Sequence, residues 1–339
     1  MNFFQIKHSK IKLLSAALIG VLAIATLSGC GGQKDSAGGD KDQVVIGTQN
    51  LVNGDLIAQK EKWYEQELGV PVKIVKFDSG KDVNAALASG SIDIGQEGTA
   101  PAALAIANGV DIDIVWINDI LGSAETLVAK NDSNIHSLQD LKGKRVATPF
   151  SSTSHYSLLQ ALKKAGIDEN EVKIIDMQPD KINAAWQTGD IDAAYIWYPV
   201  LDQLLKNGTP IIDSAQLAKQ GVVTADVTVV NNKYAKAHPD IIKKYVKLQE
   251  RANDTILKDK DKAIKDMAAI LELSEEDVAK QITGYTYLTA QQEQDYLDNT
   301  FAKSVKDIAD FLVETKSIPS APELSVYQQH VTSAYVKGE

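Results

Sequence analysis

The stretch VKIVKFDSGKDVNAALASGSIDIG at residues 72–95 recurs at residues 172–194 as VKIIDMQPDKINAAWQTGDIDAA. With one gap at Gly80, nine of the 23 paired positions are identical. Each copy is typical of a β-branched strand, a loop, a helix that ends at Gly90 or Gly189, and a second strand. The distance between the copies is too long for a solenoid repeat. The repeat therefore predicts two similar α/β lobes.

The segments around both copies extend this alternation of strands and helices. We expect strands at 43–49, 72–77, 92–95, 112–118, 144–148, 172–177 and 193–197, with helices at 55–68, 83–89, 100–108, 155–165 and 180–188. Such alternation predicts a mostly parallel sheet flanked by helices in each lobe. From Pro239 onward the pattern is mainly helical.

Two β-branched segments, 125–130 and 226–232, are the expected crossings between the lobes. We expect lobe 1 to comprise residues 44–126 and 229–339, and lobe 2 to comprise residues 127–228.

The first 42 residues have the features of an export signal and a tether. Lys7, Lys10 and Lys12 precede an apolar run at 13–27, which matches the charged and apolar regions of a signal peptide at 1–29. Leu27-Ser28-Gly29-Cys30 resembles the lipobox of bacterial lipoproteins, which implies acylation of Cys30 and cleavage before it. The Gly-rich and charged stretch 30–42 predicts a flexible tether. We expect a lipid-anchored protein on the extracytoplasmic face of the cell membrane, with a plain secretion signal as the alternative.

Composition and charge exclude several classes of protein. The 339 residues are 44% hydrophobic and 24% charged, which is ordinary for a globular chain. Without the three lysines of the predicted signal, the formal charge of −10 becomes −13, and an acidic surface argues against nucleic acid as a partner. The five histidines and one cysteine form no metal-ligand pattern, so no metal or cofactor is expected.

A ligand of an open α/β sheet binds where strands end and helices begin. Four such corners are 49–55, 78–80, 96–101 and 151–156. Hydroxyls accompany two of them, at Thr99 and in the SSTS run that includes Ser152. Each hydroxyl alone is explained equally well as a helix N-cap. Two hydroxylated helix N-termini that face one cleft from separate lobes would form an anion site.

Four further side chains are candidate ligand-site residues, and each also has a purely structural explanation. Trp197 ends a strand on the side of the cleft, or it is a core residue. Glu125 and Asp226 lie among apolar residues, where a carboxylate is costly unless it is paired, so they form salt bridges within the protein or face a ligand cation. His155 packs or caps a helix, or it takes part in chemistry.

An exported serine hydrolase would use Ser154 or Ser157 with His155. A nucleophile and its base must meet in space with an orienting acid and an oxyanion hole. Neighbours in sequence at the start of a helix point apart, and the chain has no GxSxG elbow. We therefore expect a binding protein and not an enzyme.

Five segments resemble the taurine-binding proteins of bacterial ABC importers: 77–80, 122–130, 149–163, 184–199 and 286–292. These proteins belong to a wider group that binds aliphatic sulfonates, nitrate and pyrimidine precursors. The resemblance implies a two-lobed periplasmic-binding-protein-like fold of type 2, with a small sulfonate held in the cleft between the lobes. It also implies a monomer that works with a permease and a separate ATPase, since the chain has no GxxxxGK[ST] motif.

Taurine carries an ammonium and a sulfonate, and the resemblance implies a contact residue set that suits both. Together with the corner residues, the predicted ligand site consists of Gln49, Gly98, Thr99, Glu125, Ser152, Thr153, His155, Tyr156, Trp197 and Asp226. Two positions depart from the family pattern. Thr228 stands where an aromatic residue is frequent, and Glu97 is a carboxylate close to the expected sulfonate.

Overall fold

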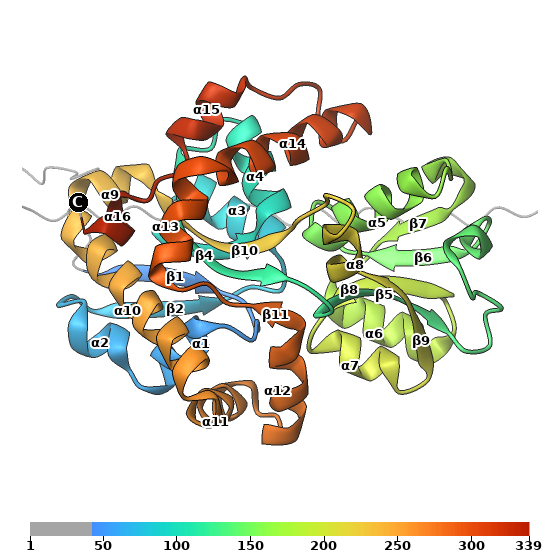
Figure 1. Cartoon of the computed structure of the whole chain (residues 1–339), viewed down its shortest axis with the longest axis horizontal. Coiled ribbons are helices and arrows are strands. Elements are labelled where there is room, and N and C mark those ends of the chain that lie inside the picture. The colour runs from blue at the N-terminus through green and yellow to red at the C-terminus, as the bar shows by residue number, and fades with distance from the viewer. Residues whose placement is uncertain (1–42, 339) are drawn as a thin grey trace, which may run out of the picture. The chain divides into compact units, whose positions relative to one another are not determined.

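Two separate β-sheets organise the described part of the chain, residues 43–338 of a computed structural model (Figure 1). The predicted signal peptide, the tether and Cys30 lie outside the described residues. No helix within residues 43–338 combines the length and the apolar character needed to cross a membrane.

The first sheet has six strands in the order β11-β4-β10-β3-β1-β2. Their bounds are β1 Val44–Thr48, β2 Val72–Lys76, β3 Ile94–Gly98, β4 Ile112–Leu121, β10 Ala225–Asn231 and β11 Tyr285–Thr286. β1 pairs in parallel with β2 and β3. β10 runs antiparallel to β3 and β4, and β11 antiparallel to β4.

The second sheet has five strands in the order β7-β6-β8-β5-β9. Their bounds are β5 Glu125–Lys130, β6 Arg145–Thr148, β7 Lys173–Asp176, β8 Ala193–Trp197 and β9 Gly208–Asp213. β6 pairs in parallel with β7 and β8, whereas β5 runs antiparallel to β8 and β9.

The sequence repeat corresponds to equivalent parts of the two sheets. Residues 72–95 include β2, α3 (Gly80–Ala88) and the start of β3, and residues 172–194 include β7, α6 (Pro179–Thr188) and the start of β8. In each sheet the two repeat strands flank one central strand, β1 or β6. The predicted two-lobed α/β fold is confirmed, with one difference: the sheets are mixed, because β5 and β10 run antiparallel to their neighbours.

We call the first sheet with its helices lobe 1 and the second sheet with its helices lobe 2. The remaining helices of lobe 1 are α1 Gly54–Lys60, α2 Trp63–Glu67, α4 Thr99–Ala107, α9 Asn232–Ala237, α10 Pro239–Lys258, α11 Lys260–Leu271, α12 Glu275–Gln281, α13 Ala290–Asn299, α14 Phe301–Glu314, α15 Leu324–Gln329 and α16 Ala334–Lys337, with the 3₁₀ turn Ile282–Gly284. Those of lobe 2 are α5 Thr153–Lys164, α7 Val200–Leu205 and α8 Ser214–Ala218, with the 3₁₀ turns Leu138–Leu141 and Glu169–Glu171.

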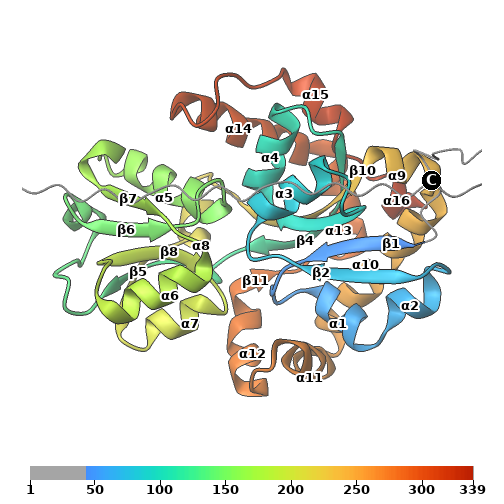
Figure 2. The same cartoon turned by 180° about the vertical axis from the view of Figure 1, so that it is seen from behind.

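Helices cover both faces of each sheet. In lobe 2, α5 lies on one side of the sheet and α6 and α7 on the other (Figure 2). In lobe 1, Gln96 donates from its side chain to the Tyr245 hydroxyl on α10, whereas the neighbouring Glu97 lies beside Gly80 of α3. Successive strand residues point to opposite faces, so α10 and α3 cover opposite faces of the first sheet.

Three details differ from the sequence predictions. The single helix expected at 55–68 is two helices separated at Lys62, whose φ of 58° is left-handed. The helix expected at 100–108 is α4, which begins at Thr99 and has Pro101 as its third residue. The expected lobe boundaries fall inside β5 and β10, whereas each of these strands lies whole in one sheet, so the chain passes between the sheets at 122–124 and 219–224.

The lobes also touch where α14 of lobe 1 extends over α5 of lobe 2 (Figure 1). The Lys163 ammonium forms an exposed ion pair with Glu314 at 2.6 Å. The Tyr156 ring packs edge-on against Phe311, with ring centroids 5.3 Å apart. We refer to these four side chains as the α14–α5 contact.

Candidate ligand site

A buried cavity lies between the two lobes, at strand ends and helix N-termini. Its lining consists of Gln49, Leu51, Gly80, Gly98, Pro101, Leu121, Glu125, Ser152, Thr153, Trp197, Asp226 and Tyr285. Seven of the ten predicted site residues are among them: Gln49, Gly98, Glu125, Ser152, Thr153, Trp197 and Asp226. The free volume is ≈ 20 Å³, about enough for a water molecule, so a larger molecule enters only if the lobes separate.

The N-termini of α4 and α5 meet in this cavity from opposite lobes. Gly98 is the N-cap residue of α4, and Thr153 is the first residue of α5. A Cβ atom on Gly98 would lie 2.6 Å from Thr153 Cγ2, which is closer than two carbon atoms can approach. Glycine is therefore required here by the contact between the lobes, since its φ of −77° is open to any residue.

Gly98→Ala should weaken the binding of every ligand held between the lobes. The added methyl must push Thr153 and its lobe away, and overpacking of this kind costs about 1 to 3 kcal/mol. We expect calorimetric titrations to show the same fold-loss for ligands of different chemistry.

The double variant Gly98→Ala/Thr153→Ser is the control for the Gly98 variant. Serine lacks the Cγ2 atom that obstructs the new methyl but keeps the hydroxyl. Affinity should return toward that of the unmodified protein. A loss that persists in the double variant would show that the Gly98 methyl acts through some other contact.

The hydroxyls at the start of α5 are already engaged within lobe 2. Ser152 Oγ donates to the Pro149 carbonyl at 2.6 Å and accepts the His155 N–H, as an N-cap does. Thr153 Oγ1 donates to Glu125. The first N–H groups of a helix have no acceptor inside it, so the backbone of Thr153 and Ser154, and not the hydroxyls, supplies the donors that α5 presents to an anion.

Glu125 accepts hydrogen bonds from four hydroxyls of its own lobe. Its Oε1 accepts from Thr153 at 2.5 Å and from Ser154 at 2.8 Å. Its Oε2 accepts from Ser214 at 2.9 Å and more weakly from Ser157 at 3.4 Å. Burial raises the pKa of Glu125, and the hydroxyl donors oppose this rise because they favour the charged form.

Asp226 is the second carboxylate of the cavity and is differently placed. It lies in register with Gly98 on β3 and with Asp119 on β4. Only 5% of Asp226 is exposed, and its Oδ2 has no hydrogen-bond partner within residues 43–338. Burial raises the pKa of Asp226 to about 8, and the negative charge of Glu125 adds to the rise.

Charge in the cavity is one-sided. Among the described residues its lining contains no lysine, arginine or histidine, although it contains the carboxylates Glu125 and Asp226. A third carboxylate, Asp119, lies beside Asp226 on the neighbouring strand β4. The N-termini of α4 and α5 carry the positive ends of the helix dipoles and supply partial positive charge at another side of the cavity. This arrangement suits a small molecule with a cationic group and an anionic group.

Two of the other predicted site residues face neighbours away from the cavity. Thr99 Oγ1 accepts from the Ala225 N–H at 3.2 Å. The Tyr156 hydroxyl accepts from Gln160 at 3.1 Å, and its ring packs on Phe311 in the α14–α5 contact. Thr99 directly follows Gly98, and Tyr156 lies three residues after Thr153, but the helix directs both side chains away from the cavity.

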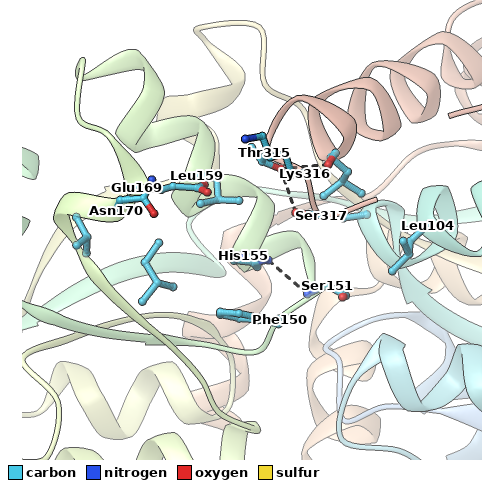
Figure 3. A pocket seen from close by; sticks show the side chains of 14 residues that line it. Leu104, Phe150, Ser151, His155, Leu159, Glu169, Asn170, Thr315, Lys316 and Ser317 are labelled. Carbon is cyan, nitrogen blue, oxygen red and sulfur yellow. Dashed lines mark hydrogen bonds between the residues drawn. The ribbon is translucent and has the colours of Figure 1, made fainter. Parts of the chain in front are cut away.

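His155 does not line the cavity; it lines a separate groove, whose walls come from α5 and its neighbours in lobe 2 and from Leu104 and Lys316 of lobe 1 (Figure 3). Its ring stacks on Phe150 with centroids 4.3 Å apart, and its Nδ1 accepts from the Ser151 N–H at 3.4 Å. Burial lowers the pKa of His155 to about 4. Ser154 and Ser157 instead donate to Glu125, so these serines and His155 form no nucleophile–base pair.

The two departures from the family pattern lie outside the cavity lining. Glu97 is fully buried on the face of β3 that α3 covers, and burial raises the pKa of Glu97 well above its usual range. Thr228 donates to Asn118 at 3.0 Å on the neighbouring strand. Neither side chain opposes an anion at the N-termini of α4 and α5.

Two polar residues that the sequence did not predict are Tyr285, which lines the cavity, and Asp119, the cross-strand neighbour of the cavity residue Asp226. Asp119 lies just beyond the segment at 112–118 that was expected to be the strand, and β4 continues through it to Leu121. Tyr285 lines the cavity from β11, a two-residue strand in the helical C-terminal part of the chain. The long apolar run that precedes Asn118 indicates a strand long enough to include Asp119. No comparable sequence pattern indicates that Tyr285 lies in a strand.

A two-lobed fold with a polar cavity between the lobes defines a protein that binds small molecules. The taurine-binding periplasmic protein of Escherichia coli (strain K12) is 38% identical over 300 residues, which cover 87% of this chain and 92% of that protein. A putative aliphatic sulfonates-binding protein of Bacillus subtilis (strain 168) is 28% identical over 305 residues, 88% of this chain and 89% of the relative.

Solved structures agree on the fold. The alkanesulfonate-binding protein SsuA from Xanthomonas axonopodis pv. citri, bound to MOPS, superposes with a TM-score of 0.72 at 24% identity, covering 87% of this chain and 99% of that one. The NMT1/THI5-like family model matches residues 50–263. This chain belongs to the NMT1/THI5-like family, and its relatives are binding proteins and not enzymes.

Proposed function

We propose that this protein binds taurine and delivers it to the permease of an ABC importer. The observation that carries the proposal is the pairing, in one buried cavity, of two carboxylates with two helix N-termini. The ammonium of taurine would bind at the carboxylates, and its sulfonate would bind at the helix N-termini. The 38% identity to a taurine-binding protein supports the same ligand.

Ligand binding proceeds by separation and closure of the lobes in this proposal. The cavity is buried, and its walls come from both lobes, so a ligand that contacts both walls stabilises the closed arrangement. A ceiling of roughly 1.5 kcal/mol per heavy atom limits the binding free energy of taurine to about −10 kcal/mol. The dissociation constant is then at best in the tens of nanomolar.

The remaining parts of the proposal concern location and partners. Cys30 carries a lipid that holds a monomeric protein at the extracytoplasmic face of the cell membrane, after removal of residues 1–29. Two relatives support an extracytoplasmic place because their names include the word periplasmic. The ATPase that drives import is a separate protein.

Thermal melting with and without ligand tests the proposal. Taurine at 100 times its dissociation constant should stabilise the protein by about 2.7 kcal/mol, which raises the Tm by several degrees. Sulfate and nitrate, which lack an ammonium, serve as controls. An unchanged Tm with saturating taurine would overturn taurine as the ligand.

Another aliphatic sulfonate is the second candidate ligand. Leu51 and Leu121 give the cavity apolar wall area, which suits an alkyl chain, and the B. subtilis relative bears an aliphatic-sulfonate name. Calorimetry with taurine and ethanesulfonate separates the two candidates. Nitrate and pyrimidine precursors complete the panel.

A further inference from the structure

We propose that Asp119 and Asp226 share one proton in the unliganded protein, and that an amino-sulfonate displaces this proton whereas a simple alkyl sulfonate does not. Asp119 is then a positioning residue that acts through Asp226. The inference rests on the proposed function and adds to it: one site accepts two classes of sulfonate by exchanging a proton for an ammonium, and solution pH selects between them.

The geometry places the two acids side by side in the interior. Asp119 on β4 and Asp226 on β10 are direct cross-strand partners, which places their side chains on the same face of the sheet as neighbours, and both oxygens of Asp119 and Oδ2 of Asp226 have no hydrogen-bond partner among the described residues. Asp119 is fully buried and Asp226 nearly so. Two adjacent carboxylates without water or a cation repel each other strongly, so one of them holds a proton.

Nothing nearby among residues 43–338 replaces that proton with a fixed cation. Glu125 faces the pair from β5 and adds a negative charge. Tyr285 and Tyr287 face it from β11 and the following loop, and burial with the two acids keeps the pKa of each phenol above its usual range. Asn53 donates its side-chain N–H to Gln96, and both Asp119 oxygens have no hydrogen-bond partner among the described residues.

A second observation points to a ligand at this place. The Tyr285 hydroxyl lines the cavity, is almost fully buried, and has no hydrogen-bond partner within the described residues. Asp226 Oδ2 is unpartnered in the same cavity. An ammonium has three N–H donors and would satisfy both oxygens.

The exchange keeps the buried charge constant. Without ligand, Asp119, Asp226 and Glu125 carry one proton among them. When the ligand ammonium enters, the proton leaves for solvent and the ammonium takes its place, so the net charge of the cavity is unchanged. A ligand with a neutral tail brings no cation, and the proton stays. Burial raises the pKa of Asp119 well above its usual range, as it does that of Asp226, so the proton is still bound at pH 7.

The experiment is calorimetry at pH 7 in two buffers whose heats of protonation differ. The difference in apparent binding enthalpy gives the number of protons released. We expect close to one proton for taurine and none for ethanesulfonate. By linkage, taurine affinity should rise between pH 6 and 7 by up to about tenfold, whereas ethanesulfonate affinity should not rise.

Two variants identify the carboxyl groups responsible. Asp119→Asn keeps the side-chain shape but removes the shared proton, so proton release by taurine and the rise with pH should both disappear. Glu97→Gln removes another buried carboxyl with a raised pKa, on the opposite face of the adjacent strand, and should leave proton release unchanged. If Asp119→Asn fails to fold, the two-buffer measurement on the unmodified protein still decides.

The outcomes separate this inference from the proposed function. Tight taurine binding without proton release would overturn the shared proton and leave the function intact. Equal proton release for both ligands would also overturn the shared proton, because the release would not depend on the ammonium. Loss of the release in Glu97→Gln would assign the proton to Glu97 instead. Binding of neither sulfonate would remove the proposed function itself.

Discussion

Replacing Asp226 with alanine should weaken taurine binding far more than ethanesulfonate binding. Asp226 brings an unpartnered carboxylate oxygen to the cavity, and the loss of one partner from a desolvated ion pair costs about 2 to 5 kcal/mol. Ethanesulfonate has no ammonium to leave unpaired. Matched titrations of the two ligands should therefore show a ratio of affinities that falls by more than tenfold.

Thr228→Ala is the matched control for Asp226→Ala. Thr228 lies two residues along the same strand, is equally buried, and donates to Asn118 outside the cavity lining. Its loss should affect stability without changing the ratio of the two affinities. If Asp226→Ala instead reduces both affinities equally, Asp226 stabilises the fold and does not contact the ammonium.

Replacing Glu125 should damage both the fold and the site. Glu125→Leu leaves the buried hydroxyls of Thr153, Ser154 and Ser214 without their acceptor, and unsatisfied buried donors cost about 1 to 3 kcal/mol each. Several donors lose their acceptor together, so the free energy of unfolding should fall by about 3 kcal/mol or more. Chemical denaturation would measure this loss.

Glu125→Gln separates the structural part from the ligand part. The amide oxygen still accepts from Thr153 and Ser154, so most of the stability should remain. The negative charge is lost, however, so taurine should still bind more weakly relative to ethanesulfonate. A Gln variant with unchanged selectivity would restrict Glu125 to holding the start of α5.

The repeat made the fold predictable because both copies keep the same periodicity through strand, helix and strand. Local patterns also located the cavity corners, since strand ends and N-caps have recognisable residues such as Ser152. The direction of β5 and β10 was not readable from the sequence. Whether a strand runs parallel or antiparallel depends on which strands it meets, and that is a property of the whole sheet.

Residues of the site could be predicted where the position of a residue along one strand or helix determines the direction in which its side chain points. Glu125 and Trp197 are cross-strand partners on β5 and β8, so both reach the cavity. His155 and Tyr156 follow Thr153 along a helix, where each step turns the side chain by about 100°, and they face other neighbours. Tyr285 reaches the cavity only through tertiary pairing of β11 with β4, which no local pattern encodes.

The α14–α5 contact gives this protein a way to adjust ligand retention without altering ligand choice. Its ion pair, Lys163 with Glu314, is exposed, so it contributes at most about 1 kcal/mol and weakens as salt increases. None of its side chains lines the cavity, so we expect a change in this contact to alter the residence time of every ligand by a similar factor. Substitutions in α14 should therefore change the residence time of a bound ligand, while the ranking of ligands, which depends on the carboxylates and the helix N-termini, should stay the same.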